Sequence, residues 1–201
     1  MNIALITSNH LRHKFISHKL SEQLNLKLIL TENKRVSIED TSKYSSDKER
    51  ETINLHFESR RNSEEEFFSE YMNFPENVLH VPVEKGNMNS QVTLDLLQKM
   101  SIDIIVLYGC ALIKDIILDE FEGKVINLHL GLSPYYRGSG TNFFPIVNNE
   151  FECLGATFHL ATKIIDGGAI LFQIRPDDLD ENDTIHSIGN KIIRKAGEIY
   201  P

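Results

Sequence analysis

Three polar side chains that could act on one reacting group lie in two short stretches of the sequence. Asn127 and His129 end the stretch 125–129, whose β-branched start and alternating polar residues predict a buried strand. Because they are two positions apart on a strand, their side chains point the same way. Asp166 lies 39 positions after Asn127 (166 − 127) and precedes two glycines, which predicts a tight turn. An amide donor, an imidazole and a carboxylate suit a reaction that creates an oxyanion and moves a proton.

The order of motifs around these residues resembles that of the folate-dependent formyltransferases. The motifs, in chain order, are Asn127-x-His129, Pro134, Arg137-Gly138, Gly155-x-Thr157-x-His159 and Asp166-Gly167-Gly168. Asn-x-His alone would carry no weight, but the ordered set is specific, and a weaker resemblance extends over the whole chain. It implies one catalytic domain, residues 1–201, with an α/β Rossmann-like fold: a mainly parallel, twisted sheet with helices on both faces.

Formyl transfer gives each of the three polar residues a role. The attack of an amine on a formyl group makes a tetrahedral intermediate, whose oxyanion needs preplaced donors such as Asn127 and His129. Asp166 would favour a cationic imidazole, or accept the proton shed by the amine through a water. The alternative remains open that Asn127 and His129 are strand-end residues bonded to backbone and that Asp166 only shapes its turn.

The resemblance also implies the site of the folate donor, 10-formyltetrahydrofolate. A flat pterin suits a slot in which backbone groups pair with its edge and aliphatic side chains cover its faces. The residues that match the family's slot are Ala111, Leu112, Ile113, Leu118, Thr162, Lys163, Ile164 and Ile165. For the aliphatic residues, and for Leu118 above all, a place in the ordinary core is the alternative.

The acceptor amine is expected to meet two loops. Asn9, His10 and Arg12 belong to a basic loop after the first strand, which is either an acceptor contact or a solvated helix start. Arg137 and Asn142 are expected to meet phosphate or hydroxyl groups of the acceptor, with a structural role as the alternative for Asn142. No acidic or cysteine ligands accompany the histidines at metal-binding spacing, so no metal is expected.

Among the family's branches, the loop 133–142 looks most like that of enzymes formylating amino sugars, often nucleotide-linked. A methionyl-tRNA formyltransferase is disfavoured because the chain is acidic, with a net charge of −8, and ends at Pro201. A glycinamide ribonucleotide formyltransferase is disfavoured because its polar acceptor contacts align with Ile193 and Ala196. That enzyme, a 10-formyltetrahydrofolate hydrolase and a non-catalytic folate- or nucleotide-binding module remain alternatives.

Composition and length are those of one globular domain. No apolar run approaches the roughly 18 residues that span a bilayer, and the N-terminus starts a strand rather than a signal peptide. We therefore expect a cytoplasmic protein that binds folate and a small amine, with neither nucleic acid nor membrane as partner; self-association as a homodimer is left open. Because relatives continue with a further helix, we also expect the chain to be cut near a domain edge.

The remaining elements follow from hydrophobic patterning. Helices are expected over 15–24, 64–72, 89–100 and 184–198, the last capped by Asn182 or Asp183. Strands are expected over 2–7, 27–30, 78–83, 102–109, 155–160 and 169–174. The polar segment 31–54 is interpreted as an insertion or loop. Cys110 and Cys153 are expected as reduced thiols in apolar surroundings.

Overall fold

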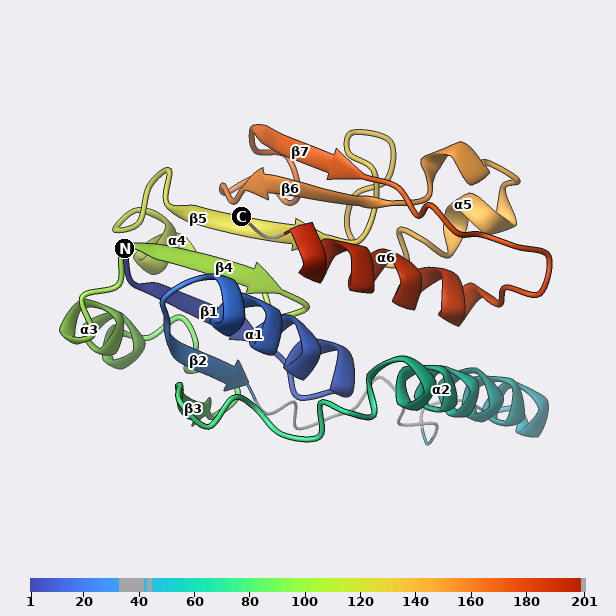
Figure 1. Ribbon diagram of the computed structural model, residues 1–201, viewed down its shortest axis with the longest axis horizontal. Coiled ribbons are helices and arrows are strands. Elements are labelled where there is room, and N and C mark those ends of the chain that lie inside the picture. Colours follow the sequence, from blue (N-terminus) through green and yellow to red (C-terminus); the bar gives the residue numbers. More distant parts are fainter. Residues whose placement is uncertain (33–41, 43–44, 200–201) are drawn as a thin grey trace.

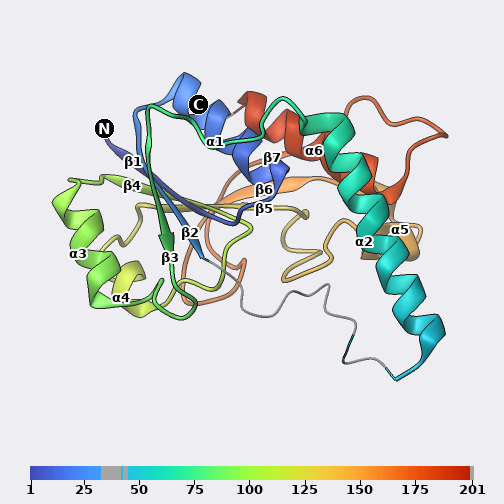
Figure 2. The same ribbon diagram turned by 90° about the horizontal axis from the view of Figure 1, so that it is seen from below.

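A computed structural model describes residues 1–32, 42 and 45–199, and these residues form a seven-stranded sheet between two layers of helices (Figures 1 and 2). The strands are β1 (Ile3–Thr7), β2 (Leu26–Glu32), β3 (Leu79–Val83), β4 (Ile104–Tyr108), β5 (Val125–His129), β6 (Ala156–Leu160) and β7 (Ile170–Ile174). The α-helices are α1 (Leu11–Gln23), α2 (Asp47–Phe68), α3 (Gln91–Lys99), α4 (Asp115–Leu118), α5 (Phe144–Val147) and α6 (Ile185–Ile199). A 3-10 turn, η2 (Phe151–Cys153), follows α5.

The sheet has the strand order β3-β2-β1-β4-β5-β6-β7. Strands β1 to β5 pair in parallel, whereas β6 is antiparallel to β5 and β7 is antiparallel to β6. The chain winds outwards from β1 in one direction and from β4 in the other, so the carboxyl ends of these neighbours border the crevice in which ligands of such sheets bind. The predicted α/β fold with a mainly parallel sheet is confirmed.

Each face of the sheet is covered by its own apolar layer, because inner parallel strands must be buried on both sides. On one face Ile3, Leu5, Val106 and Tyr108 pack with residues of α1, α2 and α6. On the other face Ala4, Ile6, Ile105 and Leu107 pack with residues of α3 and α4. Figure 2 shows α1 and α6 on the opposite side of the sheet from α3 and α4.

Helix α1 begins at Leu11, four residues before the predicted start at Phe15. The backbone N–H of His10 donates to Nδ1 of His13 at 3.1 Å. This bond satisfies a donor at the helix start that would otherwise have no partner, so the basic loop shortens.

Helix α6 lies within one residue of the predicted span at each end. The prediction of Asn182 or Asp183 as its cap is wrong, because Thr184 caps the helix. Thr184 and Ser187 bond reciprocally, with Thr184 N–H donating to Ser187 Oγ at 2.8 Å and Ser187 N–H to Thr184 Oγ1 at 3.1 Å. Ser187 thus takes the place of the Glu or Gln that usually completes a capping box. Without that acidic or amide residue, the sequence does not mark Thr184 as the cap.

Helix α2 corrects two further expectations. It covers residues 47–54, which were assigned to a loop, and it ends at Phe68 rather than at Met72. Residues 33–41 and 43–44 of that predicted loop lie outside the described residues. Helical patterning of 89–100 places Val92 with Leu94, Leu96 and Leu97 on an apolar side, but in α3 the side chain of Val92 is 77% exposed. Cys110 and Cys153 are not joined in a disulfide, and both are half-buried rather than fully in the core.

Candidate active site

Strand β5 carries Asn127 and His129 to the carboxyl edge of the sheet, where both side chains leave the same face. Its antiparallel partner β6 places His159 opposite Asn127 and Thr157 opposite His129. Cross-strand neighbours lie within side-chain reach of one another. The register of this strand pair therefore brings a second histidine to the two residues that the sequence singled out.

Asp166 reaches the same place from the turn between β6 and β7. Its backbone has a φ of +47°, in the left-handed region where Asp is better tolerated than most residues. Its Oδ1 accepts from Asn127 Nδ2 at 3.0 Å, and its Oδ2 accepts from the backbone N–H of Gly138 at 2.8 Å. A Cβ on Gly168 would lie 1.8 Å from the carbonyl oxygen of Leu160, so the turn that presents Asp166 needs glycine there.

Two imidazoles flank this carboxylate. His129 Nδ1 lies 3.3 Å from Asp166 Oδ2, and His159 Nε2 lies 3.4 Å from Asp166 Oδ1. The outer nitrogens donate to backbone carbonyls at 2.9 Å, His129 Nε2 to Tyr136 and His159 Nδ1 to Leu160. Both rings are therefore held in orientation from behind, with the remaining nitrogen facing Asp166.

The pKa values of this group reflect its contacts more than its burial. Burial alone would raise the pKa of Asp166, but hydrogen bonds from His159 and Gly138 and the nearby imidazoles hold this pKa below its ordinary 3.8. Burial alone would lower the pKa of His159, but the hydrogen bonds to Asp166 and to the Leu160 carbonyl hold this pKa above its ordinary 6.5. At a pH between the lowered pKa of Asp166 and the raised pKa of His159, an ionised carboxylate therefore faces a cationic imidazole.

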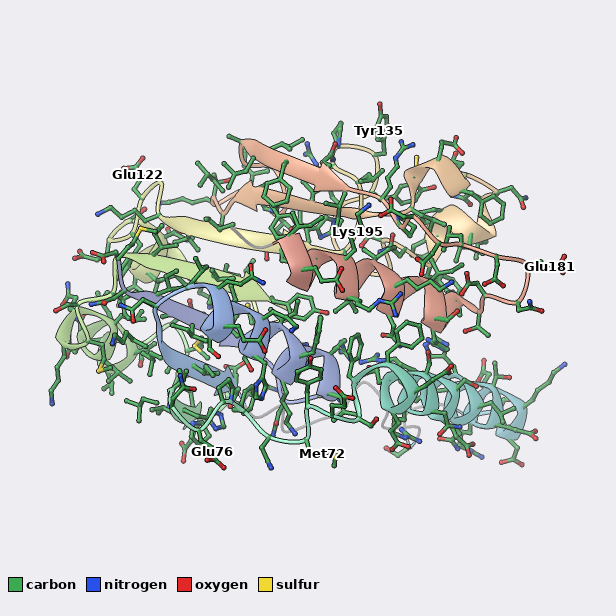
Figure 3. The ribbon with its side chains drawn as sticks, in the orientation of Figure 1. Met72, Glu76, Glu122, Tyr135, Glu181 and Lys195 are labelled. Carbon is green, nitrogen blue, oxygen red and sulfur yellow. The ribbon has the colours of Figure 1, made fainter. Side chains whose placement is uncertain are left out.

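Thr157 fixes the loop that follows β5. Its hydroxyl donates to the Gly131 carbonyl at 2.7 Å and accepts from the Ser133 N–H at 3.0 Å and from Gln173 Nε2 at 3.0 Å. The threonine is fully buried, so these bonds form away from water and hold the loop onto β6 and β7. Farther along the loop, the side chain of Tyr135 projects away from the body (Figure 3) and is 75% exposed.

A cavity of about 890 Å³ lies at this edge of the sheet, and Asn127, His129, His159 and Asp166 all border it. Its size suits a ligand larger than most metabolites, or two ligands side by side. Asn127 Nδ2 lies 3.0 Å from Asp166 Oδ1 and 3.1 Å from His159 Nε2, so Asn127, like His129, would exchange one of its two contacts to donate to an incoming carbonyl oxygen. The group can thus donate to a developing oxyanion and accept a proton nearby.

A model of the family described as "Formyl transferase" matches residues 2–201. The chain belongs to the formyl transferase family. Part of it is 34% identical to the methionyl-tRNA formyltransferase of Finegoldia magna, over 57% of this chain and 39% of that protein. Part is 32% identical to the phosphoribosylglycinamide formyltransferase of Haemophilus influenzae, over 53% of this chain and 50% of that protein. These matches therefore span half or less of the curated relatives.

The fold is shared with solved members of the formyl transferase family. The phosphoribosylglycinamide formyltransferase of Anaplasma phagocytophilum has a TM-score of 0.66, at 16% identity, over 100% of this chain and 82% of that one. Relatives with different acceptors in their names thus resemble this formyl transferase about equally. Within the described residues, no helix is both long and apolar enough to cross a membrane, and no three metal-ligating side chains gather to hold an ion.

Most of the predicted binding residues border the cavity of this formyl transferase. The residues expected at the folate that do so are Ala111, Leu112, Ile113, Leu118, Thr162, Ile164 and Ile165, and those expected at the acceptor are Asn9, His10 and Arg12. The former lie towards the face covered by α3 and α4, since Ile113 and Leu118 belong to that apolar layer. Arg12 does not project freely, because it pairs with Glu64 of α2.

Three predicted contacts lie elsewhere. Lys163 faces solvent and pairs with Asp119 at 2.9 Å, so its ammonium serves the surface. Asn142 uses both ends of its amide on the backbone of Gly155, each at 3.0 Å, which makes its role structural. Arg137 is exposed and is not among the residues that border the cavity. Side-chain direction in loops depends on such local bonds, which spacing does not reveal.

The residues that border the cavity but were not predicted as site residues include His159, Tyr108 and Arg60, and Glu64 pairs with Arg60 beside it. His159 had a signal, because it closes the Gly-x-Thr-x-His motif and alternates with Thr157 along its strand. Tyr108 was interpreted as part of an apolar strand. No sequence pattern marks Arg60, and Glu64 lies in a run of charges that is typical of a solvated helix face, yet Glu64 is 5% exposed. Only the position of α2 in the fold shows that Arg60 and Glu64 lie beside Arg12.

Proposed function

We propose that this formyl transferase moves a formyl group from 10-formyltetrahydrofolate to the primary amine of a small acceptor. The convergence of Asn127, His129 and Asp166 within hydrogen-bonding distance at one wall of a cavity carries the proposal. The amine nitrogen forms a bond to the formyl carbon, and Asn127 and His129 donate to the oxyanion of the tetrahedral intermediate. The bond from that carbon to the folate nitrogen then breaks. Asp166 takes up the proton that the amine sheds. This proton then passes to the folate nitrogen as it departs.

The bordering aliphatic residues support a place for the folate. Ile113 is 5% exposed and Leu118 is 8% exposed, so they form a fixed apolar wall, while Leu112 and Ile164 are 59% and 65% exposed and are free to cover a ring. Burial of such exposed side chains against a flat heterocycle contributes about 25 cal/mol per Å² of apolar surface. The donor would thus bind beside the reacting group, with its formyl carbon near Asn127.

For the acceptor we propose an amino sugar, often nucleotide-linked. The positions on α6 that align with polar acceptor contacts of glycinamide ribonucleotide enzymes are Ile193 and Ala196, and both are in the core, at 3% and 0% exposure. They offer no hydrogen bond. A glycinamide ribonucleotide acceptor is the second candidate, because the similarity to the Haemophilus influenzae protein favours it.

The test is an acceptor panel with 10-formyltetrahydrofolate, in which release of tetrahydrofolate and the mass of the product are followed. Formylation of a nucleotide-linked amino sugar is expected. Turnover of glycinamide ribonucleotide alone would refute the choice of acceptor, and formate release without an acceptor would indicate a hydrolase. Folate binding without any turnover would leave a binding module.

Alanine variants test the three catalytic roles. We expect Asn127→Ala, His129→Ala and Asp166→Ala each to lower turnover at least about a hundredfold, the scale of losing one oxyanion donor. Circular dichroism should show an unchanged fold. Near-wild-type turnover in any variant would remove that residue from the mechanism.

A further inference from the structure

Asn89 lies just before α3 and uses both ends of its side-chain amide on a segment farther along the chain. Its Nδ2 donates to the Leu112 carbonyl at 2.9 Å, and its Oδ1 accepts from the backbone N–H of Lys114 at 2.7 Å. The segment 111–114 lies between β4 and α4, and its first three residues border the cavity. Among the described residues that border the cavity, Asn89 is not included. Asn89 therefore holds this segment from the side away from the cavity.

The two bonds of Asn89 have the pattern that a neighbouring parallel strand makes. In a parallel ladder, one residue bonds to the carbonyl and the N–H of the two residues that flank its partner, and the partner's own groups point to the opposite edge. The Asn89 amide bonds in this way to Leu112 and Lys114, which flank Ile113. Lys114 has extended backbone angles, as the pattern requires. The N–H and carbonyl of Ile113 are thereby turned to the other edge of the segment.

The backbone of Ile113 is ready to pair with a ligand. Ile113 is 5% exposed and packs in the apolar layer under α3 and α4, yet no group of the described residues forms a hydrogen bond with its N–H or its carbonyl. Backbone groups of buried residues are almost always paired. Because Ile113 borders the cavity, a bound ligand can supply both partners. One donor beside one acceptor matches the amide-like edge of a pterin.

Asn89 is itself held in place by its two chain neighbours. Met88 is 1% exposed and packs in the same apolar layer as Ile113. Ser90 caps α3, because its Oγ accepts from the Thr93 N–H at 3.3 Å. A buried anchor on one side and a helix start on the other restrict the backbone of Asn89, so its amide can orient the segment 111–114.

We propose that Asn89 is a positioning residue for the formyl donor, because it turns the N–H and carbonyl of Ile113 towards the cavity, where they pair with the edge of the pterin. Asn89 acts through the backbone of the segment 111–114 and does not contact the donor. This inference rests on the proposed function, from which it takes the folate as ligand. It deepens that function by naming a residue outside the cavity on which donor affinity depends.

A binding titration of the full chain tests the proposal. The probe is 10-formyl-5,8-dideazafolate, a donor analogue that keeps the 2-amino-4-oxo edge of the pterin. We expect Asn89→Ala to weaken its binding about five- to tenfold, the scale of one hydrogen bond. In turnover, the KM of the donor should rise by the same factor, while kcat and the KM of the acceptor stay within about twofold. A general loss of folded protein would lower kcat instead.

Ser90→Ala is the matched control, because it loosens the start of α3 next to Asn89 without removing a bond to the segment 111–114. This variant should lower the unfolding temperature, as the loss of a helix cap does, and leave the affinity for the analogue within about twofold. An equal loss of affinity in Ser90→Ala and Asn89→Ala would overturn the proposal, and so would unchanged affinity in Asn89→Ala.

Hydrogen exchange of the unmodified chain gives a second readout that needs no variant to fold. The Lys114 amide should be protected with and without the analogue, whereas the Ile113 amide should become protected when the analogue binds. Binding without protection of Ile113 would overturn this inference and leave the proposed function intact. Failure of the analogue to bind the unmodified chain would overturn both.

Discussion

The substitution Asp166→Asn tests whether the carboxylate at the centre of the site is ionised and bonded as described. Each of its oxygens accepts a separate N–H, from Asn127 at 3.0 Å and from Gly138 at 2.8 Å. An asparagine has the same shape but only one oxygen, so in either orientation its NH2 group faces another donor. Leaving one such donor unsatisfied costs about 1–3 kcal/mol. Because Gly138 is exposed and water can reach its N–H, we expect Asp166→Asn to lower the free energy of unfolding by the lower half of this range, about 1–2 kcal/mol.

The pH dependence of this loss follows from the two shifted groups. A carboxyl whose pKa is lowered on folding stabilises the fold above its ordinary 3.8 and loses that effect as the pH falls through the folded pKa. A histidine whose pKa is raised stabilises the fold below its ordinary 6.5 and loses that effect as the pH rises through the folded pKa. The stability difference between wild type and Asp166→Asn should therefore be largest between these values and shrink on both sides.

Urea denaturation at a series of pH values measures this difference. Asp119→Asn is a matched control, because Asp119 is 62% exposed and its ion pair with Lys163 is at the surface, so a change within about 0.5 kcal/mol is expected. At the pH where the stability difference is largest, each kcal/mol of unfolding free energy lost in Asp166→Asn lowers the melting temperature by roughly 2–4 °C. Equal stability of wild type and Asp166→Asn at all pH values would refute the bonding pattern.

Three further substitutions separate structural from functional residues. Asn142→Ala should lower the free energy of unfolding by about 1–3 kcal/mol, since it leaves two Gly155 backbone groups without their partner, while the acceptor KM stays unchanged; a raised KM with unchanged stability would contradict this role. Lys163→Gln should change folate affinity less than about twofold in a binding titration, because exposed ion pairs contribute little, and a tenfold loss would return this residue to the folate site. Thr157→Val keeps the volume but removes three hydrogen bonds, so urea denaturation should show a loss of about 2–4 kcal/mol; a neutral result would mean that the loop after β5 is held in another way.

The sequence predicted the fold class and the meeting of Asn127, His129 and Asp166 for physical reasons. Continuous apolar runs such as 104–108 occur where a strand is covered on both faces, so they indicate a parallel sheet. The alternation of Asn127 and His129 fixes their common direction, and the glycines after Asp166 fix a turn. Each of these signals is local in the chain. The tertiary structure then placed the three side chains together, as the motif order predicted.

The buried charges beside the cavity could not be predicted in the same way. Glu64 belongs to a run of charges that resembles a solvated helix face, and Arg60 precedes it by one helical turn. Their partner Arg12 is 52 positions from Glu64, so no periodicity links them. The burial of a charge is decided by the element that packs over it, and here that element is α2 lying across the end of α1.

The sequence by itself thus determined which strands form, which way their polar ends point and to which family the chain is similar. The tertiary structure alone decided the direction of side chains in loops and the partners of charged residues, as for Lys163, Asn142 and Glu64. The reason is physical: strand and turn signals depend on neighbours along the chain, whereas hydrogen bonds and desolvation depend on neighbours in space.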